Sequence, residues 1–330
     1  MYILTIDTGT TNSRVTLWKE NIVIDKAARE VGVRDTAIDG HNQRLKTAVK
    51  NAIDDVLARN SITMGEITRI LASGMITSNV GLTEVPHLTA PVAAADLAAG
   101  MVEKQLPDVS EKGIWFVPGV KNGISPVTID NCEEMDIMRG EEAETFGLAE
   151  RLHLQGPAVI ILPGSHTKFV ALDEQNQITG CLTSLAGELL SVITHHTIIA
   201  NALDKSFASQ FDKEMVQKGY ETSKRAGLNR TCFTIRILDQ FTGLTVNQKA
   251  NFLLGAVLAD DIRALKESCA LRVSPDSQIV IAGKDMLRDA FAAVLETDGY
   301  FSRVTVADDD HLRDLAGFGV IHLASLGATS

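Results

Sequence analysis

Two short segments of glycine and small hydroxyl residues could bind phosphate. One runs from Asp7 to Leu17 and reads Asp-Thr-Gly-Thr-Thr-Asn-Ser-Arg-Val-Thr-Leu; the other runs from Leu162 to Leu172 and reads Leu-Pro-Gly-Ser-His-Thr-Lys-Phe-Val-Ala-Leu. Glycine lets a backbone approach an oxyanion closely, and Thr or Ser hydroxyls add donors to the backbone N–H groups. Two such turns facing each other across a cleft would hold a polyphosphate from both sides.

Charged residues beside the two turns would complete a phosphate site. Asp7 ends the first apolar run and would hold Mg²⁺, because hard cations prefer oxygen ligands. Arg14 and Lys168 would add positive charge near the transferred phosphate. The alternatives are a turn-capping role for Asp7 and a surface ion pair, which stabilises little, for Arg14. Because the residues occur together, we favour the phosphate site.

The elements that must position these residues follow the same order in both halves of the chain. In the first half, periodicity predicts strands at 2–6, 14–18 and 22–26, a helix near 45–57, strands at 69–73 and 114–117, and a helix at 141–152. In the second half it predicts strands at 158–162, 166–173 and 177–182, helices at 186–203, 211–225 and 248–268, a strand at 278–282, a helix at 285–297, a strand at 303–307 and a last helix from 311. This repetition predicts a duplication with domains at 1–153 and 154–330.

Composition excludes several classes of protein. The 330 residues are 45% hydrophobic and 22% charged, which is typical of a soluble globular chain. The net charge of −11 argues against nucleic-acid or anionic-membrane partners. The scattered cysteines argue against a zinc or disulfide framework, and with the absence of a basic leader before Asp7 they predict a cytoplasmic protein. These cysteines are Cys132, Cys181, Cys232 and Cys269.

Three motifs resemble those of the actin-like ATPase and sugar kinase superfamily. The first turn resembles its first phosphate motif, Gly164-Ser-His-Thr-Lys168 resembles the second, and Ile279-Val-Ile-Ala-Gly283-Lys284 resembles its adenosine motif. The resemblance implies an α/β fold of duplicated ribonuclease H-like domains with a cleft between them. Leu162 departs from the second motif, which usually has an acid there, so Asp7 would carry more of the metal binding.

Further strings are similar to the 2-dehydro-3-deoxygalactonokinase family. They are the first turn, Gly74-Met-Ile-Thr-Ser-Asn79 with Glu84-Val-Pro86, and Met138-Arg-Gly-Glu-Glu142 followed by the second turn. The family implies ATP- and Mg²⁺-dependent phosphorylation of the terminal hydroxyl of a 2-keto-3-deoxy sugar acid, above all 2-dehydro-3-deoxy-D-galactonate to its 6-phosphate. Asn79 and Leu82 stand where the family pattern has Arg and Trp, so a related sugar or sugar acid is an alternative substrate.

The resemblance implies two sets of binding residues. The nucleotide-binding set is Gly9, Thr10, Thr11, Asn12, Arg14, Gly164, Ser165, His166, Thr167, Lys168, Gly187, Gly283 and Lys284. The sugar-acid set is Met75, Thr77, Ser78, Asn79, Arg139 and Glu188. Glu188 has an equal alternative as an acid in the first turn of the helix that begins at residue 186.

The reaction also needs a carboxylate to accept the hydroxyl proton. In the superfamily this group begins a helix late in the first domain, where this chain has Gly140-Glu141-Glu142. A helix N-terminus keeps a carboxylate ionised, although acids in the first turn also commonly complement the helix dipole. Glu141 is therefore the first candidate, Glu142 the second and Asp136 the third.

Two other classes of function remain as alternatives. A sugar sensor of the same fold usually carries a DNA-binding helix-turn-helix, and a strand starting at residue 2 leaves no room for one in front. An actin-like filament or chaperone ATPase would need a longer chain. The predicted partners are a sugar acid, ATP and a second copy in a homodimer, without nucleic acid or membrane. Asp308-Asp-Asp310 is expected to cap a helix rather than bind metal.

Overall fold

The computed structural model describes residues 1–327 and contains two large sheets in which five strands follow the same order. The first sheet has the order β3-β2-β1-β4-β7-β6. Its strands are β1 (Tyr2–Thr8), β2 (Ser13–Lys19), β3 (Ile22–Arg29), β4 (Ile67–Gly74), β6 (Val102–Lys104) and β7 (Ile114–Phe116). The second sheet has the order β12-β11-β10-β13-β14. Its strands are β10 (Ala158–Leu162), β11 (Thr167–Leu172), β12 (Ile178–Ser184), β13 (Gln278–Ile281) and β14 (Arg303–Val306).

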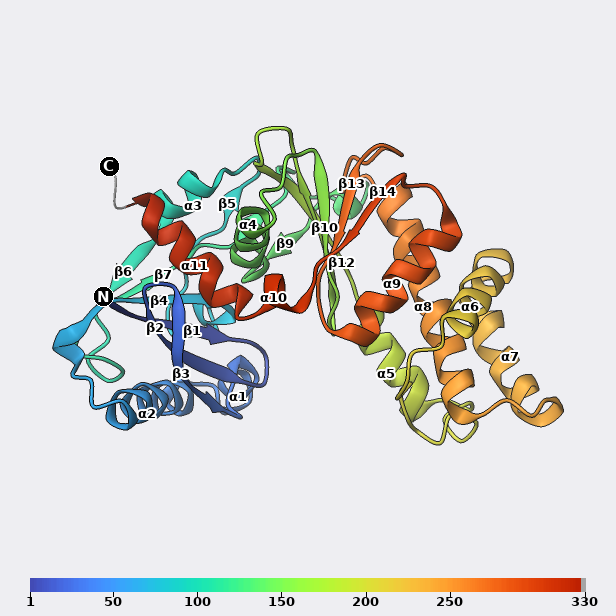
Figure 1. The fold of residues 1–330 in the computed structure, drawn as a ribbon, viewed down its shortest axis with the longest axis horizontal. Helices are drawn as coiled ribbons and strands as arrows, with labels where there is room; N and C mark the ends of the chain where they lie inside the picture. The colour runs from blue at the N-terminus through green and yellow to red at the C-terminus, as the bar shows by residue number, and fades with distance from the viewer. Residues whose placement is uncertain (328–330) are drawn as a thin grey trace.

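Matching strand pairs put the two turns in equivalent places. β1 runs antiparallel to β2 and parallel to β4, and β10 runs antiparallel to β11 and parallel to β13. Asp7 lies opposite Arg14 in the first hairpin, and Leu162 lies opposite Lys168 in the second. The predicted duplicated fold is confirmed by this topology. Figure 1 shows the two sheets in separate lobes.

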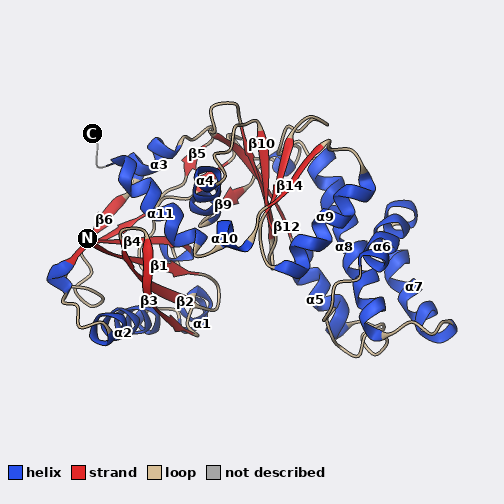
Figure 2. Cartoon of the chain, viewed as in Figure 1, coloured by secondary structure: helices blue, strands red, loops and turns tan. Residues whose placement is uncertain are grey.

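Helices cover both sheets and fill one end of the molecule (Figure 2). Helices of the first half are α1 (Val33–Asp39), α2 (Gln43–Arg59), α3 (Ala94–Gly100) and α4 (Glu141–Arg151). Those of the second half are α5 (Ala186–His196), α6 (Lys213–Ala226), α7 (Leu228–Phe241), α8 (Val246–Glu267), α9 (Asp285–Asp298), α10 (Asp309–Leu312) and α11 (Leu315–Leu326). A small sheet joins β5 (Leu88–Thr89), β8 (Val120–Lys121) and β9 (Ile137–Met138).

Two helix predictions were wrong in extent, and one helix was not predicted. α5 ends at His196 rather than at residue 203, and turns follow it. The unpredicted helix is α7, which is separated from α6 by Gly227 at φ +81°, a left-handed conformation that suits glycine. The expected last helix is two helices, because Asp314 at φ +52° interrupts it.

Helices α4 and α11 join the two halves of the molecule. α4 packs Phe146 and Ala149 in one apolar cluster with Ile160 and Val170 of the second sheet. α11, although last in the sequence, contacts α3, α4, β1 and β4 of the first half, as Figure 1 shows. The predicted boundary at residue 153 stays a prediction, and the structure adds that the chain returns to the first lobe after it.

The two helices cross at a point that only small residues permit. A Cβ at Gly319 of α11 would lie 1.9 Å from the Ala143 carbonyl oxygen of α4. Gly147 of α4 faces the same crossing, where its Cβ would lie 2.9 Å from the Gly319 Cα. Larger residues would force the two helices apart, because packed interiors leave no spare volume. The glycines therefore set how closely α11 packs on α4.

Two further findings concern the described residues as a set. Within residues 1–327, no helix has both the length and the apolar character needed to span a bilayer. All four cysteines are free thiols.

Candidate active site

A cavity of about 1140 Å³ opens between the two lobes and is lined from both hairpins. The first hairpin contributes Asp7 and Arg14, which are paired across β1 and β2. The second contributes the turn 164–166, which follows β10 directly. Gly283 and Lys284, which follow β13, complete this wall. The strand ends of both sheets thus converge on one cavity, which we call the interlobe cavity.

A second cavity of about 730 Å³ lies beside the first and is mainly lined by the first lobe. Its lining comes from the ends of β1 and β4, the loop after β4, and the segment from β9 to α4. We call it the loop cavity. The two cavities share five lining residues, which mark where they meet: Asp7, Glu141, Glu144, His166 and Ala316.

The predicted residues of the first turn divide between the cavities. Arg14 lines the interlobe cavity, whereas Gly9 and Thr10 line the loop cavity. Thr11 and Asn12 line neither; they are exposed, and the Asn12 side-chain amide donates to the Thr11 hydroxyl at 2.9 Å. The turn is closed by the Gly9 N–H, which donates to the Asn12 carbonyl at 2.9 Å. Part of the predicted phosphate turn is therefore at the site and part faces solvent.

The second turn is more firmly held. Gly164, Ser165 and His166 line the interlobe cavity. The next residue, Thr167, is buried, and burial raises the pKa of the Asp261 carboxylate to about 6, with Ser184 and then Thr167 opposing the rise. A Cβ at Gly187 would lie 2.3 Å from the Gly164 carbonyl oxygen, so the bare glycine lets α5 pack directly on the turn. Gly187 thus supports the phosphate turn from behind.

Lys168 points into the loop cavity rather than the interlobe cavity. It is buried, and its ammonium donates to the Ile137 carbonyl at 2.8 Å and to the Thr183 hydroxyl. Lys168 therefore links the second sheet to β9 of the first lobe.

Three carboxylates meet where the two cavities join. Asp7 comes from β1, while Glu141 and Glu144 come from the first turn of α4, three residues apart and so on one helix face. Burial raises the pKa of Asp7, with Arg14 lowering it and Glu141 raising it further. Burial, and then the charges of Glu141 and Asp7, raise the pKa of Glu144 to about 8. Glu144 was not among the predicted site residues, although its i+3 spacing from Glu141 is apparent in the sequence.

The two other candidate bases lie away from this meeting point. Glu142 is buried, lines neither cavity, and accepts the Gly140 N–H at 2.9 Å with each carboxylate oxygen. Burial and the neighbouring Glu141 raise its pKa to about 8. Asp136 also lines neither cavity and accepts the Thr183 hydroxyl at 2.9 Å. Of the three predicted carboxylates, Glu141 is the one that reaches both cavities.

Four residues of the predicted sugar-acid set line the loop cavity: Met75, Ser78, Asn79 and Arg139. Thr77 is buried beneath them and does not line it. The Arg139 guanidinium donates to the carbonyls of Thr77 and Val85 at 2.8 and 2.7 Å, which anchors the loop after β4. Leu82, the second departure from the family pattern, is buried in the first-lobe core.

His87 is a lining residue that was not predicted, and Glu188 is a predicted residue that lies outside both cavities. His87 lines the loop cavity and lies 3.3 Å from Arg139 through Nδ1. Burial, then Arg139 and Lys121, lower its pKa to about 4, so its ring is neutral at pH 7. Glu188 lines neither cavity; its carboxylate lies 2.8 Å from Nε2 of His166 instead.

A smaller, more apolar cavity of about 370 Å³ adjoins the interlobe cavity. The two share Gly164, Ser165, Met286 and Leu287. We call it the apolar cavity. Its other lining residues are Gly187, Leu190, Thr194, Phe207, Ala208, Ala250 and Leu254.

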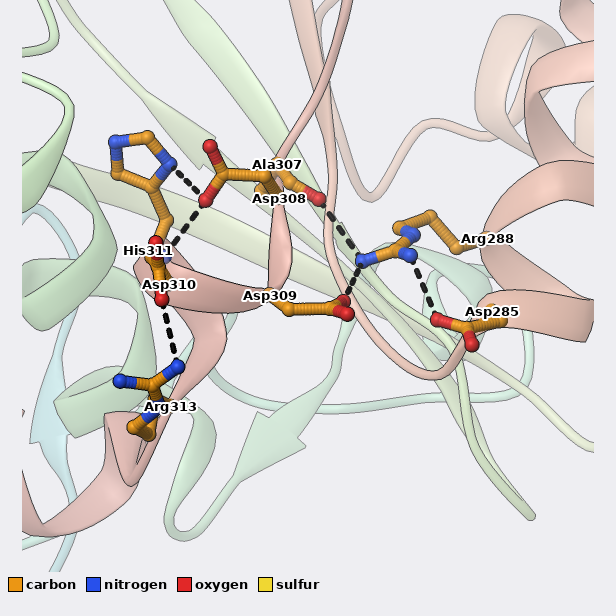
Figure 3. Close-up of polar contacts among 8 residues, drawn as sticks. All are labelled: Asp285, Arg288, Ala307, Asp308, Asp309, Asp310, His311 and Arg313. Atoms are coloured by element: carbon orange, nitrogen blue, oxygen red, sulfur yellow. Dashed lines mark hydrogen bonds and ion pairs between the residues drawn. The ribbon is translucent and has the colours of Figure 1, made fainter.

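Acidic side chains form the neighbouring rim of the interlobe cavity (Figure 3). Arg288 donates to Asp285 at 2.6 Å and to Asp309 at 2.8 Å, and so holds both carboxylates at the rim. Asp308 accepts the His311 N–H at 2.9 Å and caps α10, as predicted. Among residues 1–327, no group of three or more His, Cys, Asp or Glu side chains is arranged to hold a metal ion.

Comparison with known proteins identifies the family of the chain. The profile of the 2-keto-3-deoxy-galactonokinase family matches residues 7–317. The 2-dehydro-3-deoxygalactonokinase of Escherichia coli K12 is 25% identical over 273 residues, which cover 81% of each chain.

Two solved structures share the fold. A protein from Sinorhizobium meliloti, described as a 2-dehydro-3-deoxygalactonokinase, superposes with a TM-score of 0.75 at 22% identity, covering 98% of this chain and 96% of that one. The activator of 2-hydroxyisocaproyl-CoA dehydratase from Clostridium difficile, with bound ADPNP, superposes with a TM-score of 0.50 at 11% identity over 100% and 96% of the two chains. Since the family profile spans nearly all of the chain, including both turns and the start of α4, the protein belongs to the 2-keto-3-deoxy-galactonokinase family.

Proposed function

We propose that the protein transfers the γ-phosphoryl group of ATP to the terminal hydroxyl of 2-keto-3-deoxygalactonate, giving the 6-phosphate. The observation that carries this proposal is the meeting of two cavities at Asp7, Glu141 and His166. A kinase needs two adjacent sites whose ligands react at their boundary, since the reacting groups must lie in line. Family membership supplies the substrate class.

The interlobe cavity would bind ATP in one orientation. The apolar cavity offers apolar side chains that suit adenine, next to Met286 and Leu287. The acidic rim at Asp285 and Asp309 would repel phosphate and can accept ribose hydroxyls. The triphosphate would therefore extend toward the turn 164–166 and Arg14, with the γ-phosphoryl group at the boundary of the two cavities.

Asp7 would hold Mg²⁺, which neutralises charge on the phosphates when bound. Burial and the neighbouring Glu141 raise the pKa of Asp7, so a divalent cation there would relieve an unfavourable cluster of negative charge. Mg²⁺ usually takes one or two carboxylates, substrate phosphates and waters rather than an all-protein cage. This coordination preference is consistent with the absence, among the described residues, of a cluster of three His, Cys, Asp or Glu ligands.

Glu141 is the proposed base. It lines both cavities and begins α4, and its carboxylate accepts the Arg139 N–H at 3.1 Å, which fixes the side chain beside the loop cavity. The sugar acid would occupy the loop cavity with its terminal hydroxyl toward Glu141. Its carboxylate would lie toward Ser78, Asn79 and Arg139, which line the same cavity and supply donors.

A coupled assay of ADP release tests this function. Purified protein, MgATP and a panel of sugar acids and neutral sugars should give release with 2-keto-3-deoxygalactonate above all others. A second product assay should find the phosphate on the terminal carbon. Release with a neutral sugar but with no sugar acid would replace the proposed substrate, and no release with any member would contradict the kinase. The cytoplasmic location and the homodimer stay predictions, which fractionation and sizing can check.

A further inference from the structure

His166 is the basic side chain placed where the two cavities meet. It follows Gly164 and Ser165 on the second turn and lines both cavities. Its four companions there are the carboxylates of Asp7, Glu141 and Glu144, and Ala316. A phosphoryl group arriving at this point brings more negative charge into an acidic site, so a donor or cation is needed there besides Mg²⁺.

The other basic side chains of the site each line one cavity only. Arg14 lines the interlobe cavity alone, and Arg139 and Lys168 line the loop cavity alone. The Lys168 ammonium is already bonded to Ile137 and Thr183, and Arg139 is bonded to its loop. Among the residues that line both cavities, His166 is therefore the one that can carry positive charge.

Glu188 holds the His166 ring in place. Its Oε1 lies 2.8 Å from Nε2 of the ring, and its own backbone N–H donates to the Ser165 carbonyl at 3.0 Å. The first turn of α5 is thus joined to the phosphate turn by one side-chain and one backbone bond. Nδ1 of His166 has no hydrogen-bond partner among residues 1–327, while Nε2 is engaged. Because a carboxylate accepts, Nε2 carries the proton in this pair, and the ring can donate through Nδ1 as well when both nitrogens are protonated.

We propose that His166 donates through Nδ1 to the transferring phosphoryl group, and that Glu188 is a positioning residue acting through His166. This inference rests on the proposed function. In the step, the substrate hydroxyl oxygen bonds to the γ-phosphorus and the bond from that phosphorus to the β–γ bridging oxygen breaks. ADP leaves with that electron pair, and the hydroxyl proton passes to Glu141. His166 keeps its protons and offsets the charge on the phosphoryl oxygens.

Steady-state kinetics of His166→Gln and Glu188→Gln test the pair. Loss of one preorganised donor should lower kcat about 100-fold in H166Q, with little change in KM for the sugar acid. E188Q keeps a hydrogen bond but loses the charge, so kcat should fall about 10-fold. The double variant should be no slower than H166Q, because Glu188 acts through the ring. The matched controls are His196→Gln, exposed at the end of α5, and Glu174→Gln, exposed in a turn; both should match the wild type.

Binding of a phosphoryl mimic separates this role from a structural one. With the sugar acid present, H166Q and E188Q should bind ADP as the wild type does but bind ADP with aluminium fluoride more weakly. A turn that had merely collapsed would lose both affinities. If H166Q loses turnover and keeps its affinity for the fluoride complex, the ring moves a proton instead, and the proposal is overturned.

Different results would contradict the kinase function and the role of His166. A wild-type protein that releases no ADP with any sugar acid contradicts the kinase function itself. A wild type that is active, beside an H166Q variant with unchanged kcat, contradicts the role of His166 alone. Additive losses in the double variant would show that Glu188 acts independently of the ring and would overturn its positioning role.

Discussion

The two hairpins have the same topology but carry different chemistry. In the first, the strand ends at an acid, Asp7, with Arg14 opposite it. In the second, Leu162 takes the place of the acid, and Lys168 opposite it turns into the loop cavity. The first turn leaves Thr11 and Asn12 in solvent, whereas α5 packs directly on the second.

This difference indicates how a duplicated unit can divide a reaction between its copies. Asp7, Glu141 and Glu144, the acids at the boundary, all belong to the first half of the sequence. The second half supplies the apolar cavity and the turn with His166, on which α5 packs. We infer that the first copy handles metal and proton while the second holds the nucleotide. Substitutions on each side should therefore have separable kinetic effects.

The largest effect is expected at the proposed base. Glu141→Gln removes the proton acceptor while keeping the size of the side chain, so kcat should fall about 1000-fold. KM for ATP should change little, because the nucleotide is held by the other half. Glu150→Gln, exposed on the same helix α4, is the control. Full activity in E141Q would move the base to another carboxylate, with Glu144 next, since it also lines both cavities.

A smaller loss is expected at the acid that distinguishes the two hairpins. Asp7→Asn should lower kcat about 100-fold and raise the Mg²⁺ concentration needed for half-maximal rate. A Mg²⁺ titration of the kinase rate measures both. Asp54→Asn on α2, an exposed member of an ion pair, should leave the titration unchanged. An unaltered Mg²⁺ requirement in D7N would remove the metal from the first hairpin.

The brace behind the second turn should affect binding of the nucleotide and leave binding of the sugar acid unchanged. In Gly187→Ala the new Cβ would meet the Gly164 carbonyl at 2.3 Å, so the phosphate turn must shift. Overpacking of this kind should raise KM for ATP about tenfold, with KM for the sugar acid unchanged. Gly243→Ala, where a Cβ has open space, is the control. Equal increases in both KM values would argue against the division of labour between the copies.

Sequence patterns predicted the hairpins better than the contacts between them. Short runs rich in apolar and β-branched residues, bounded by polar turns, located β1, β2 and β11 to within about two residues. No local pattern shows that α11 returns to the first lobe, since its packing partners are distant in sequence. Local patterns equally fail to show which side chains contact each other. Glu188 was predicted either to bind the substrate or to be an acid in the first turn of its helix; it lies in that first turn, and its contact with His166, 22 residues earlier, could not be predicted.

The smallest expected effect is on stability, and it separates Glu142 from its neighbour Glu141. Burial and the Glu141 charge raise the pKa of Glu142 from 4.5 to about 8. Between these values the folded chain keeps a proton that the unfolded chain releases, so this group makes the fold less stable as pH rises from about 4.5 to about 8. Glu142→Gln cannot ionise and can still accept the Gly140 N–H. Its melting temperature should therefore exceed that of the wild type by about 2 °C at pH 8 and match it near pH 5. Thermal scans at both pH values, with kinase turnover retained, would assign Glu142 to the fold and leave Glu141 to the chemistry. A variant that melts below the wild type at pH 8 would mean that the buried carboxylate is ionised and stabilised there.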